Sequence, residues 1–227
     1  YDMFSNPVTP TESFETEVPT NGNAMAAYMM SVGLWVSGLA FCVMLSPYHQ
    51  KIKGKNAAKA WGFTLGKLWG LGILQALIMI LCLSLINNFE PEYMGKTVII
   101  ACLASVAFLT LEYCVNFFLD IIGDFILLVF MVLQLSGCAG TYPLELSDRF
   151  YQILNPFMPF TYTVHGFRSG IASNQDITTD CIVLAILALV FAGLLLIGFR
   201  ARLKKQEEET EPAETASASK LIPAQAS

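Results

Sequence analysis

The sequence predicts an all-α integral membrane protein with five transmembrane helices and, before the last of them, a re-entrant or amphipathic helix pair on the outer face. Of the 227 residues, 55% are hydrophobic and only 14% are charged. The apolar residues are gathered into long blocks, unlike the short amphipathic periods of a soluble core. About 20 apolar residues cross the hydrocarbon of a bilayer, and a helix pairs all backbone groups of such a segment internally.

Five blocks reach this length and divide the chain into three parts. The spans cover approximately residues 24–45, 61–86, 97–119, 121–140 and 181–199, and the outer helical hairpin covers about 142–172. Together they form a membrane domain over residues 24–200. Residues 1–23 are polar and are expected to be an extracytoplasmic juxtamembrane segment. Residues 201–227 are rich in Glu, Ala and Ser and are expected to be a disordered cytoplasmic tail.

Basic residues orient the predicted spans. Two clusters hold most of them: Lys51, Lys53, Lys55 and Lys59 between the first two spans, and Arg200, Arg202, Lys204 and Lys205 after the last. The positive-inside rule places both clusters in the cytoplasm. With five spans, the start of the chain and the segment before the last span then lie outside. Because the polar start shows no signal-peptide pattern, we expect the chain to be the C-terminal part of a longer protein.

Polar residues recur every four positions at the end of the third predicted span. They are Glu112, Asn116, Asp120 and Asp124, and the first three fall on one helix face. A carboxyl group within the membrane needs protein or water beside it, and Lys67 in the second span is the natural partner. Two interpretations stay open: a structural ion pair, or a pathway for protons or cations.

Small residues recur every four positions along the second span. They are Ala58, Gly62, Gly66 and Gly70, which share one face and let another helix approach closely. That face is expected to contact a neighbouring span of the same chain or a second copy in a homodimer. The basic loop before it, with Lys51, Lys53, Lys55 and Lys59, anchors the topology or docks a cytoplasmic partner such as an ATPase.

Prolines divide the segment before the last span into two short helices. Pro143 can begin a helix over residues 144–154, Pro156 and Pro159 end it, and a second helix is expected over residues 162–172. Since helices this short cannot cross the bilayer, we expect them to dip into its outer face as a lid. The candidate outer-gate residues are Tyr142, Pro143, Glu145, Pro156, Pro159, Tyr162 and Arg168.

Three of these gate residues have simpler roles as well. Arg168 is expected to reach lipid headgroups or to pair with Glu145 or Asp148. Tyr142 and Tyr162 are expected to anchor the segment at the membrane interface rather than to contact a ligand.

The motifs of enzymes and metal sites are missing from the sequence. It has no GxxxxGK[ST], GxSxG, CxxC or HExxH pattern, and only two histidines. Four of the six cysteines fall inside predicted spans; Cys138 and Cys181 lie near the outer surface, where a disulfide between them is one alternative. We therefore expect neither catalysis nor a cofactor or metal, and no nucleic-acid partner. The bilayer is the expected surrounding.

Ordered motifs around the proline-rich segment resemble one bacterial family. Residues 123–171 contain a Gln followed by G-T-Y-P, N-P-F-x-P and T-Y-x-V-x-G-x-R, and residues 6–36 lead into the first span. This combination resembles the C-terminal membrane domain of the YhgE/Pip (phage infection protein) family over most of residues 6–200. The family is in turn similar to the membrane permeases of type-2 ABC transporters, whose six-span half has short re-entrant helices before its last span.

The resemblance implies two classes of function. One is a permease-like protein that exports a substrate as a dimer, with a separate ATPase subunit touching the Lys51–Lys59 loop. The other is a cell-envelope scaffold or receptor, because members of the family act in phage adsorption or with type VII secretion components. The resemblance also implies an upstream span and a large extracytoplasmic region, and location in the bacterial plasma membrane. Of the two classes, the resemblance favours the transport-related one.

Overall fold

The computed structural model describes residues 21–45, 48, 52, 56–138, 140 and 147–220, with side chains left out at 21–24, 207 and 209–220. Within these ranges every regular element is helical. The long helices are α2 (Asn21–Leu45), α3 (Ala57–Asn87), α4 (Met94–Leu119), α5 (Ile121–Gly137) and α8 (Thr178–Lys220). Short elements lie between α5 and α8: α6 (Arg149–Leu154), a 3₁₀ turn η3 (Asn155–Phe157), α7 (Pro159–Arg168) and a π-helical turn η4 (Ser169–Ser173).

Four of the long helices are long and apolar enough to cross a membrane. In the described part of the chain these segments are Met25–Leu45, Ala57–Asn87, Met94–Leu119 and Thr178–Gln206. The fourth predicted span corresponds to α5, a shorter apolar helix of 17 residues that ends at Gly137. Asp120 separates it from α4 with a left-handed φ of 52°. The predicted turn between the third and fourth spans is therefore a single-residue break.

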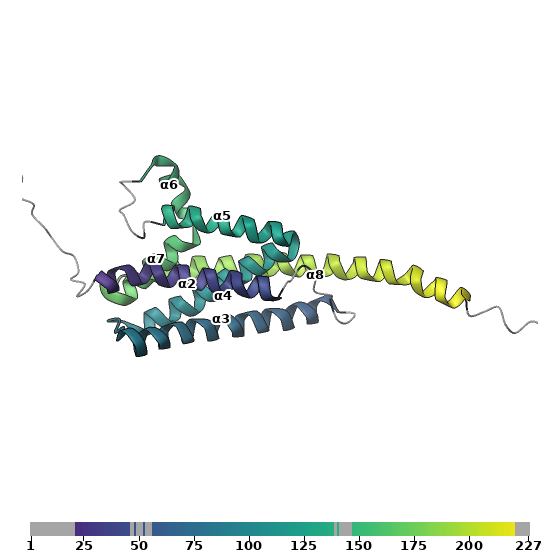
Figure 1. Cartoon of the computed structure of the whole chain (residues 1–227), viewed down its shortest axis with the longest axis horizontal. Helices are drawn as coiled ribbons and strands as arrows, with labels where there is room; N and C mark the ends of the chain where they lie inside the picture. The colour runs from purple at the N-terminus through teal and green to yellow at the C-terminus, as the bar shows by residue number, and fades with distance from the viewer. Residues whose placement is uncertain are drawn as a thin grey trace, which may run out of the picture.

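Helix α4 is the centre of the bundle, in contact with α2, α3, α5, α7 and α8 (Figure 1). Most of its side chains are buried, whereas α3, α5 and α8 turn large apolar side chains outward. Exposed examples are Phe63, Leu74, Leu85, Phe125, Leu128, Ile186 and Leu189. Such a surface would aggregate in water but matches the hydrocarbon of a bilayer. The protein is a multi-pass membrane protein.

Helix α7 is packed into one end of the bundle, which we call the α7 end. Phe160, Val164 and Phe167 are buried there, and α7 contacts α2, α4, α5 and α8. The ring centroid of Phe160 lies 5.6 Å from that of Trp35 in α2 and 5.5 Å from that of Phe108 in α4. Aromatic packing therefore joins three helices at this point. By contrast, α6 stands away from the bundle beside α5 (Figure 1).

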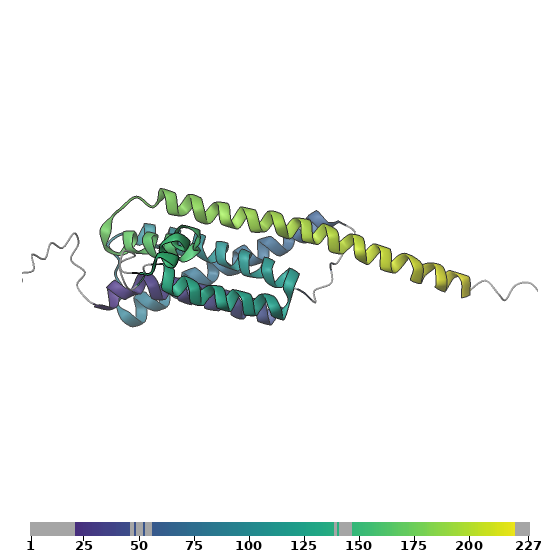
Figure 2. The ribbon, with the colours of Figure 1, turned by 90° about the horizontal axis from the view of Figure 1, so that it is seen from above.

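Helix α8 extends far beyond the other helices (Figure 2). The tail expected to be disordered from residue 201 is instead helical through Lys220, and residues 221–227 lie outside the described part. The run after the span is rich in Arg, Lys, Glu and Gln, which are good helix formers. Lys204 and Glu208, four residues apart, are within 3.9 Å of each other and support the extension.

Candidate functional site

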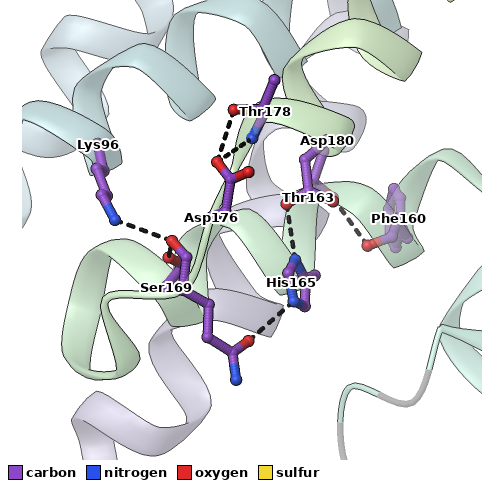
Figure 3. Close-up of polar contacts among 9 residues, drawn as sticks. Lys96, Phe160, Thr163, His165, Ser169, Asp176, Thr178 and Asp180 are labelled. Atoms are coloured by element: carbon purple, nitrogen blue, oxygen red, sulfur yellow. Dashed lines mark hydrogen bonds and ion pairs between the residues drawn. The ribbon is translucent and has the colours of Figure 1, made fainter.

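The α7 end carries a network of polar side chains (Figure 3). His165 on α7 lies with Nδ1 2.7 Å from Oδ2 of Asp180, in the first turn of α8. Its other ring nitrogen, Nε2, lies 3.0 Å from Oε1 of Gln175. The Asp180 side chain is only 5% exposed, whereas that of His165 is 47% exposed. A solvent-facing imidazole therefore covers a nearly buried carboxylate.

The loop between η4 and α8 completes this network. Lys96 Nζ, from the start of α4, donates to Oδ1 of Asn174 at 2.8 Å and to the Gln175 carbonyl at 2.9 Å. Asp176 accepts from the backbone N–H of Thr178 at 3.0 Å and from its hydroxyl at 2.6 Å. These hydrogen bonds, with the charge of Lys96 nearby, lower the pKa of Asp176. The loop is thus tied to α4 and α8 simultaneously.

Backbone contacts join η4 to the start of α4. The N–H of Tyr93 donates to the Gly170 carbonyl at 2.9 Å, and that of Glu92 donates to the Ile171 carbonyl at 3.1 Å. A Cβ added to Gly170 would lie 2.5 Å from Oγ1 and 2.9 Å from the backbone nitrogen of Thr97. Only glycine fits this approach. The π-helical turn therefore docks on α4 through its main chain, and such turns are frequent at functional sites.

The predicted gate residues are divided between this end and the undescribed segment. Tyr142, Pro143 and Glu145 lie outside the described residues. Pro156 is in η3, Pro159 begins α7, and the Tyr162 hydroxyl donates to the Pro156 carbonyl at 2.7 Å. Arg168 donates to the carbonyl of Gly140 at 2.8 Å, which links α7 to the end of α5. This carbonyl contact was not among the partners predicted for Arg168.

A second polar group lies inside the bundle, between α4, α2 and α5. Glu112 is fully buried, and neither oxygen of its carboxyl group has a hydrogen-bond partner among the described residues. It packs directly on Gly38 of α2, where an added Cβ would overlap its Oε2. One turn along α4, Asn116 donates from Nδ2 to Oδ1 of Asp124 in α5, while its own Oδ1 has no described partner.

The predicted pairing of Glu112 with Lys67 is wrong. Lys67 is exposed, with Nζ 4.1 Å from the ring centroid of Phe63 on the surface of α3. The buried side of α3 carries Leu65 and Leu68, so the helix turns Lys67 away from α4. Asp120 occupies the break between α4 and α5. Of the predicted polar face, the structure thus brings together Glu112, Asn116 and Asp124.

The small residues of α3 face away from the rest of the chain. Ala58, Gly62, Gly66 and Gly70 are all exposed, and a Cβ added to any of the three glycines would meet nothing within 4 Å. The expected contact with a neighbouring span is therefore wrong among the described residues. Helix α3 packs on α4 through Leu65, Leu68, Gly72, Ala76 and Ile80 instead. Bulky apolar residues determine its buried face, and the four-residue glycine spacing did not predict it.

The opposite end of the bundle is closed by Arg202 of α8. Its guanidinium donates to the Phe117 carbonyl of α4 at 2.7 Å and lies 3.6 Å from the centroid of the Phe117 ring. A cation there stabilises the carbonyls of the last turn of α4. In the loop before α3, Lys51, Lys53 and Lys55 lie outside the described residues, and Lys59 is exposed on the first turn of α3.

The described residues contain neither a disulfide bond nor a cluster of side chains that could hold a metal ion. All six cysteines are free, so the alternative of a Cys138–Cys181 disulfide is wrong. No cluster of three His, Cys, Asp or Glu side chains in this part of the chain has the geometry to hold a metal ion. The polar groups that remain are those of the α7 end and of the interior around Glu112.

Asp180, Gln175, Asn174 and Lys96 were missed from the sequence. Asp180 is the only acidic residue in the apolar part of α8, before Glu207, and lies in its first turn, where the helix dipole favours a carboxylate; His165 is one of two histidines in the sequence. These two facts were the available signal. The pairing itself joins residues 15 positions apart across a loop, and spacing alone does not predict it.

Comparison with known proteins finds a bacterial relative, which supports the assignment as a multi-pass membrane protein. The chain is 31% identical over 217 residues to the uncharacterized protein YhgE of Bacillus subtilis (strain 168). The similarity covers 94% of the chain but only 28% of the length of that relative. No family model matches the chain, and no solved structure matches it. The similarity supports the resemblance to YhgE-like proteins.

Proposed function

We propose that the chain is the C-terminal membrane module of a YhgE/Pip-like protein in the bacterial plasma membrane and that it works in transport or export as a permease-like unit. The observation that carries this proposal is the position of α7. Its buried aromatic side chains close one end of a bundle whose interior holds the unpartnered carboxyl group of Glu112. A closed end above a polar interior is the arrangement expected of a gated protein.

In this proposal α5 is the fourth of five spans, and the α7 end is the outer one. At 1.5 Å per residue, its 17 residues reach about 25 Å, so α5 spans a slightly thinned bilayer. The basic residues Lys59 and Arg202 are then cytoplasmic, as the positive-inside rule requires. Phe150, Ile153 and Phe157, exposed on α6 and η3, lie at the outer interface, where they dip into the lipid as the predicted lid does.

The proposed partners follow from the surfaces that remain uncovered. The exposed glycine face of α3 packs against a second copy in a homodimer, because glycines let helix backbones approach closely in lipid. The basic loop before α3 contacts a separate ATPase subunit or a component of a secretion system. In this proposal the module itself performs no catalysis and needs no cofactor.

The alternative function is a non-transporting envelope scaffold or receptor. The observation that favours it is the density of hydrogen bonds at the α7 end, where His165, Lys96 and Asp176 all have partners. A rigid cap suits a platform that holds an external domain in place. A gate must release these contacts, whereas a platform keeps them.

A reversible lock on η4 separates the two functions. Cysteines replace Lys96 of α4 and Asn174, the residue that ends η4, whose side chains are joined by an exposed hydrogen bond of 2.8 Å. A thiol-reactive cross-linker with an internal disulfide joins the two cysteines in the intact protein, whose native cysteines are replaced. The protein is purified from its native membranes and reconstituted in vesicles of host lipids with any ATPase that accompanies it. Transport predicts that cross-linking lowers ATPase turnover and that cleavage of the cross-linker by reduction restores it. If no ATPase accompanies the protein, while its deletion abolishes secretion or phage adsorption, the scaffold function holds.

A further inference from the structure

Besides two buried donors, Trp35 Nε1 on α2 and Gln134 Nε2 on α5, the groups without partners among the described residues include three hydrogen-bond acceptors on one face of α4. They are the two carboxyl oxygens of Glu112 and Oδ1 of Asn116, one turn along the same face of α4. Glu112 is 0% exposed and Asn116 is 2% exposed. Nearby, Asp124 contributes another carboxyl group, which accepts from Asn116 Nδ2. Buried acceptors need either a positive charge or a donated hydrogen to replace the hydration that they lose on burial, and these acceptors have no hydrogen-bonded donor.

The titratable groups on the surrounding helices do not supply that charge. From α2 the neighbour is the Cys42 thiol, and from α5 it is Asp124; both are close enough to Glu112 to interact electrostatically. On α3, Lys67 points outward over Phe63. On α8, Arg202 donates to the Phe117 carbonyl, and on α7, His165 faces Asp180. Tyr113 and Cys114 of α4 are themselves buried.

Two ligands could satisfy such acceptors, a metal cation or a proton. A metal cation needs several ligands at once, and the described residues contain no group of three acidic, His or Cys side chains that could hold one. A proton needs a single oxygen. An ionised carboxylate here would carry a large desolvation cost with no hydrogen-bonded donor to offset it, whereas the neutral acid avoids this cost and gains a donor O–H.

We propose that Glu112 is a proton-binding site, occupied in this closed arrangement, with its carboxylic acid O–H donating to a neighbouring acceptor such as Asn116 Oδ1. Opening of the bundle would admit water to Glu112 and release the proton as a carboxylate forms. The site thereby links a protonation step to the conformation of the bundle. This inference does not rest on the proposed transport function, because a scaffold can contain the same site.

Infrared spectroscopy of the intact protein in lipid vesicles at neutral pH tests the site directly. The wild-type spectrum is expected to contain a carboxylic acid carbonyl band that is lost in Glu112→Gln and retained in the matched control Glu92→Gln, whose carboxyl group is exposed. Gln is a neutral isostere of the acid, so the melting temperature of Glu112→Gln should equal that of the wild type. In Glu112→Asp the band should shift rather than vanish.

Three results would overturn the proposal. One is that Glu112→Gln removes an ionised carboxylate band instead of the acid band. Another is a carboxylate band that appears only with Na⁺ and not with choline, which would assign the site to a metal cation. The last is failure of both Glu112 variants to fold, because a neutral isostere does not disturb a site that is already neutral. A lost transport activity alone would bear on the proposed function and not on the proton.

Discussion

Polar side chains have hydrogen-bond partners at the α7 end of the bundle, whereas the Glu112 carboxyl group in the interior has none among the described residues. At the α7 end, the side chains of His165, Lys96 and Asp176 each meet partners from other elements. In the interior, Glu112 is more deeply buried than any of them and has no described hydrogen-bond partner. Buried polar groups are nearly always paired when their role is structural. The paired end is therefore held together by its polar residues, and the unpaired interior is the candidate for chemistry.

This difference predicts how each region responds to mutation. Removing a polar group from the α7 end should leave a partner unsatisfied and lower stability. Replacing the Glu112 carboxyl group in the interior by the neutral amide of Gln should cost little stability, because the carboxyl group is proposed to be neutral already.

Gly170→Val should have the largest effect, a loss of about 2–3 kcal/mol in the free energy of unfolding, because its Cβ would overlap Thr97 of α4. Thermal unfolding of the intact protein in detergent measures it. The control is Gly95→Val at the same end, where an added Cβ meets nothing within 4 Å. Equal stability of the two variants would show that η4 is not docked on α4 as described.

His165→Ala should lower the free energy of unfolding by about 1–3 kcal/mol, since the nearly buried Asp180 carboxylate loses its closest partner. The same thermal assay applies. Gln152→Ala, on the exposed α6, is the control and should stay within about 0.5 kcal/mol of the wild type. A His165→Ala protein as stable as this control would mean that the network does not hold the α7 end together.

Arg202→Met should cost about 1–2 kcal/mol, because the last turn of α4 loses a charged donor at the Phe117 carbonyl. Methionine keeps much of the apolar contact with the Phe117 ring. The matched control is Arg200→Met, since Arg200 is exposed two residues earlier on α8. This pair shows whether the end opposite α7 also depends on a polar contact; identical melting temperatures would limit that dependence to the α7 end.

Asp176→Asn should have the smallest effect and a distinctive pH dependence. The Thr178 hydrogen bonds lower the pKa of Asp176 in the folded protein. The carboxylate therefore stabilises the fold above its unfolded pKa of about 4 and loses this contribution as pH falls through the lower folded value. Melting temperatures of wild type and variant should differ slightly at pH 7 and converge at pH 3. Asp148→Asn, at a position without a side-chain cap, is the control. A difference in melting temperature that persists at pH 3 would show that the effect comes from the shape of the side chain and not from its charge.

Helix positions were predictable because each depends on a local property of the chain. The first four apolar blocks became α2, α3, α4 and α5 within a few residues at each end, and the fifth became α8, which starts near its predicted position but continues to Lys220. Prolines 156 and 159 mark the break between the two short helices, since Pro156 enters a 3₁₀ turn and Pro159 begins α7. The first short helix starts at Arg149 rather than near residue 144 in the described part. The exact ends of a helix depend on contacts with residues distant in the sequence, which a local sequence pattern does not contain.

The candidate sites were less predictable because they depend on helix rotation and on pairs distant in sequence. Spacing by four placed Glu112 and Asn116 on one face, and the structure adds Asp124 from α5 beside them. The same rule failed for the α3 glycines and for Lys67, because spacing identifies a face without saying which way it turns. Large apolar residues such as Leu65 and Leu68 decided that direction by packing on α4.

Local patterns in the amino-acid sequence were enough to predict a helical membrane protein, the approximate positions of its long helices, and a proline-broken pair of short helices before the last span. Hydrophobic length and backbone hydrogen bonding in lipid are local constraints, so composition alone expresses them. Three other features became visible only in the folded structure: α7 packs into one end of the bundle, His165 pairs with Asp180, and the Glu112 carboxyl group has no described hydrogen-bond partner. Each of these depends on how separate helices rotate and pack against α4, and packing couples residues that the linear order keeps apart.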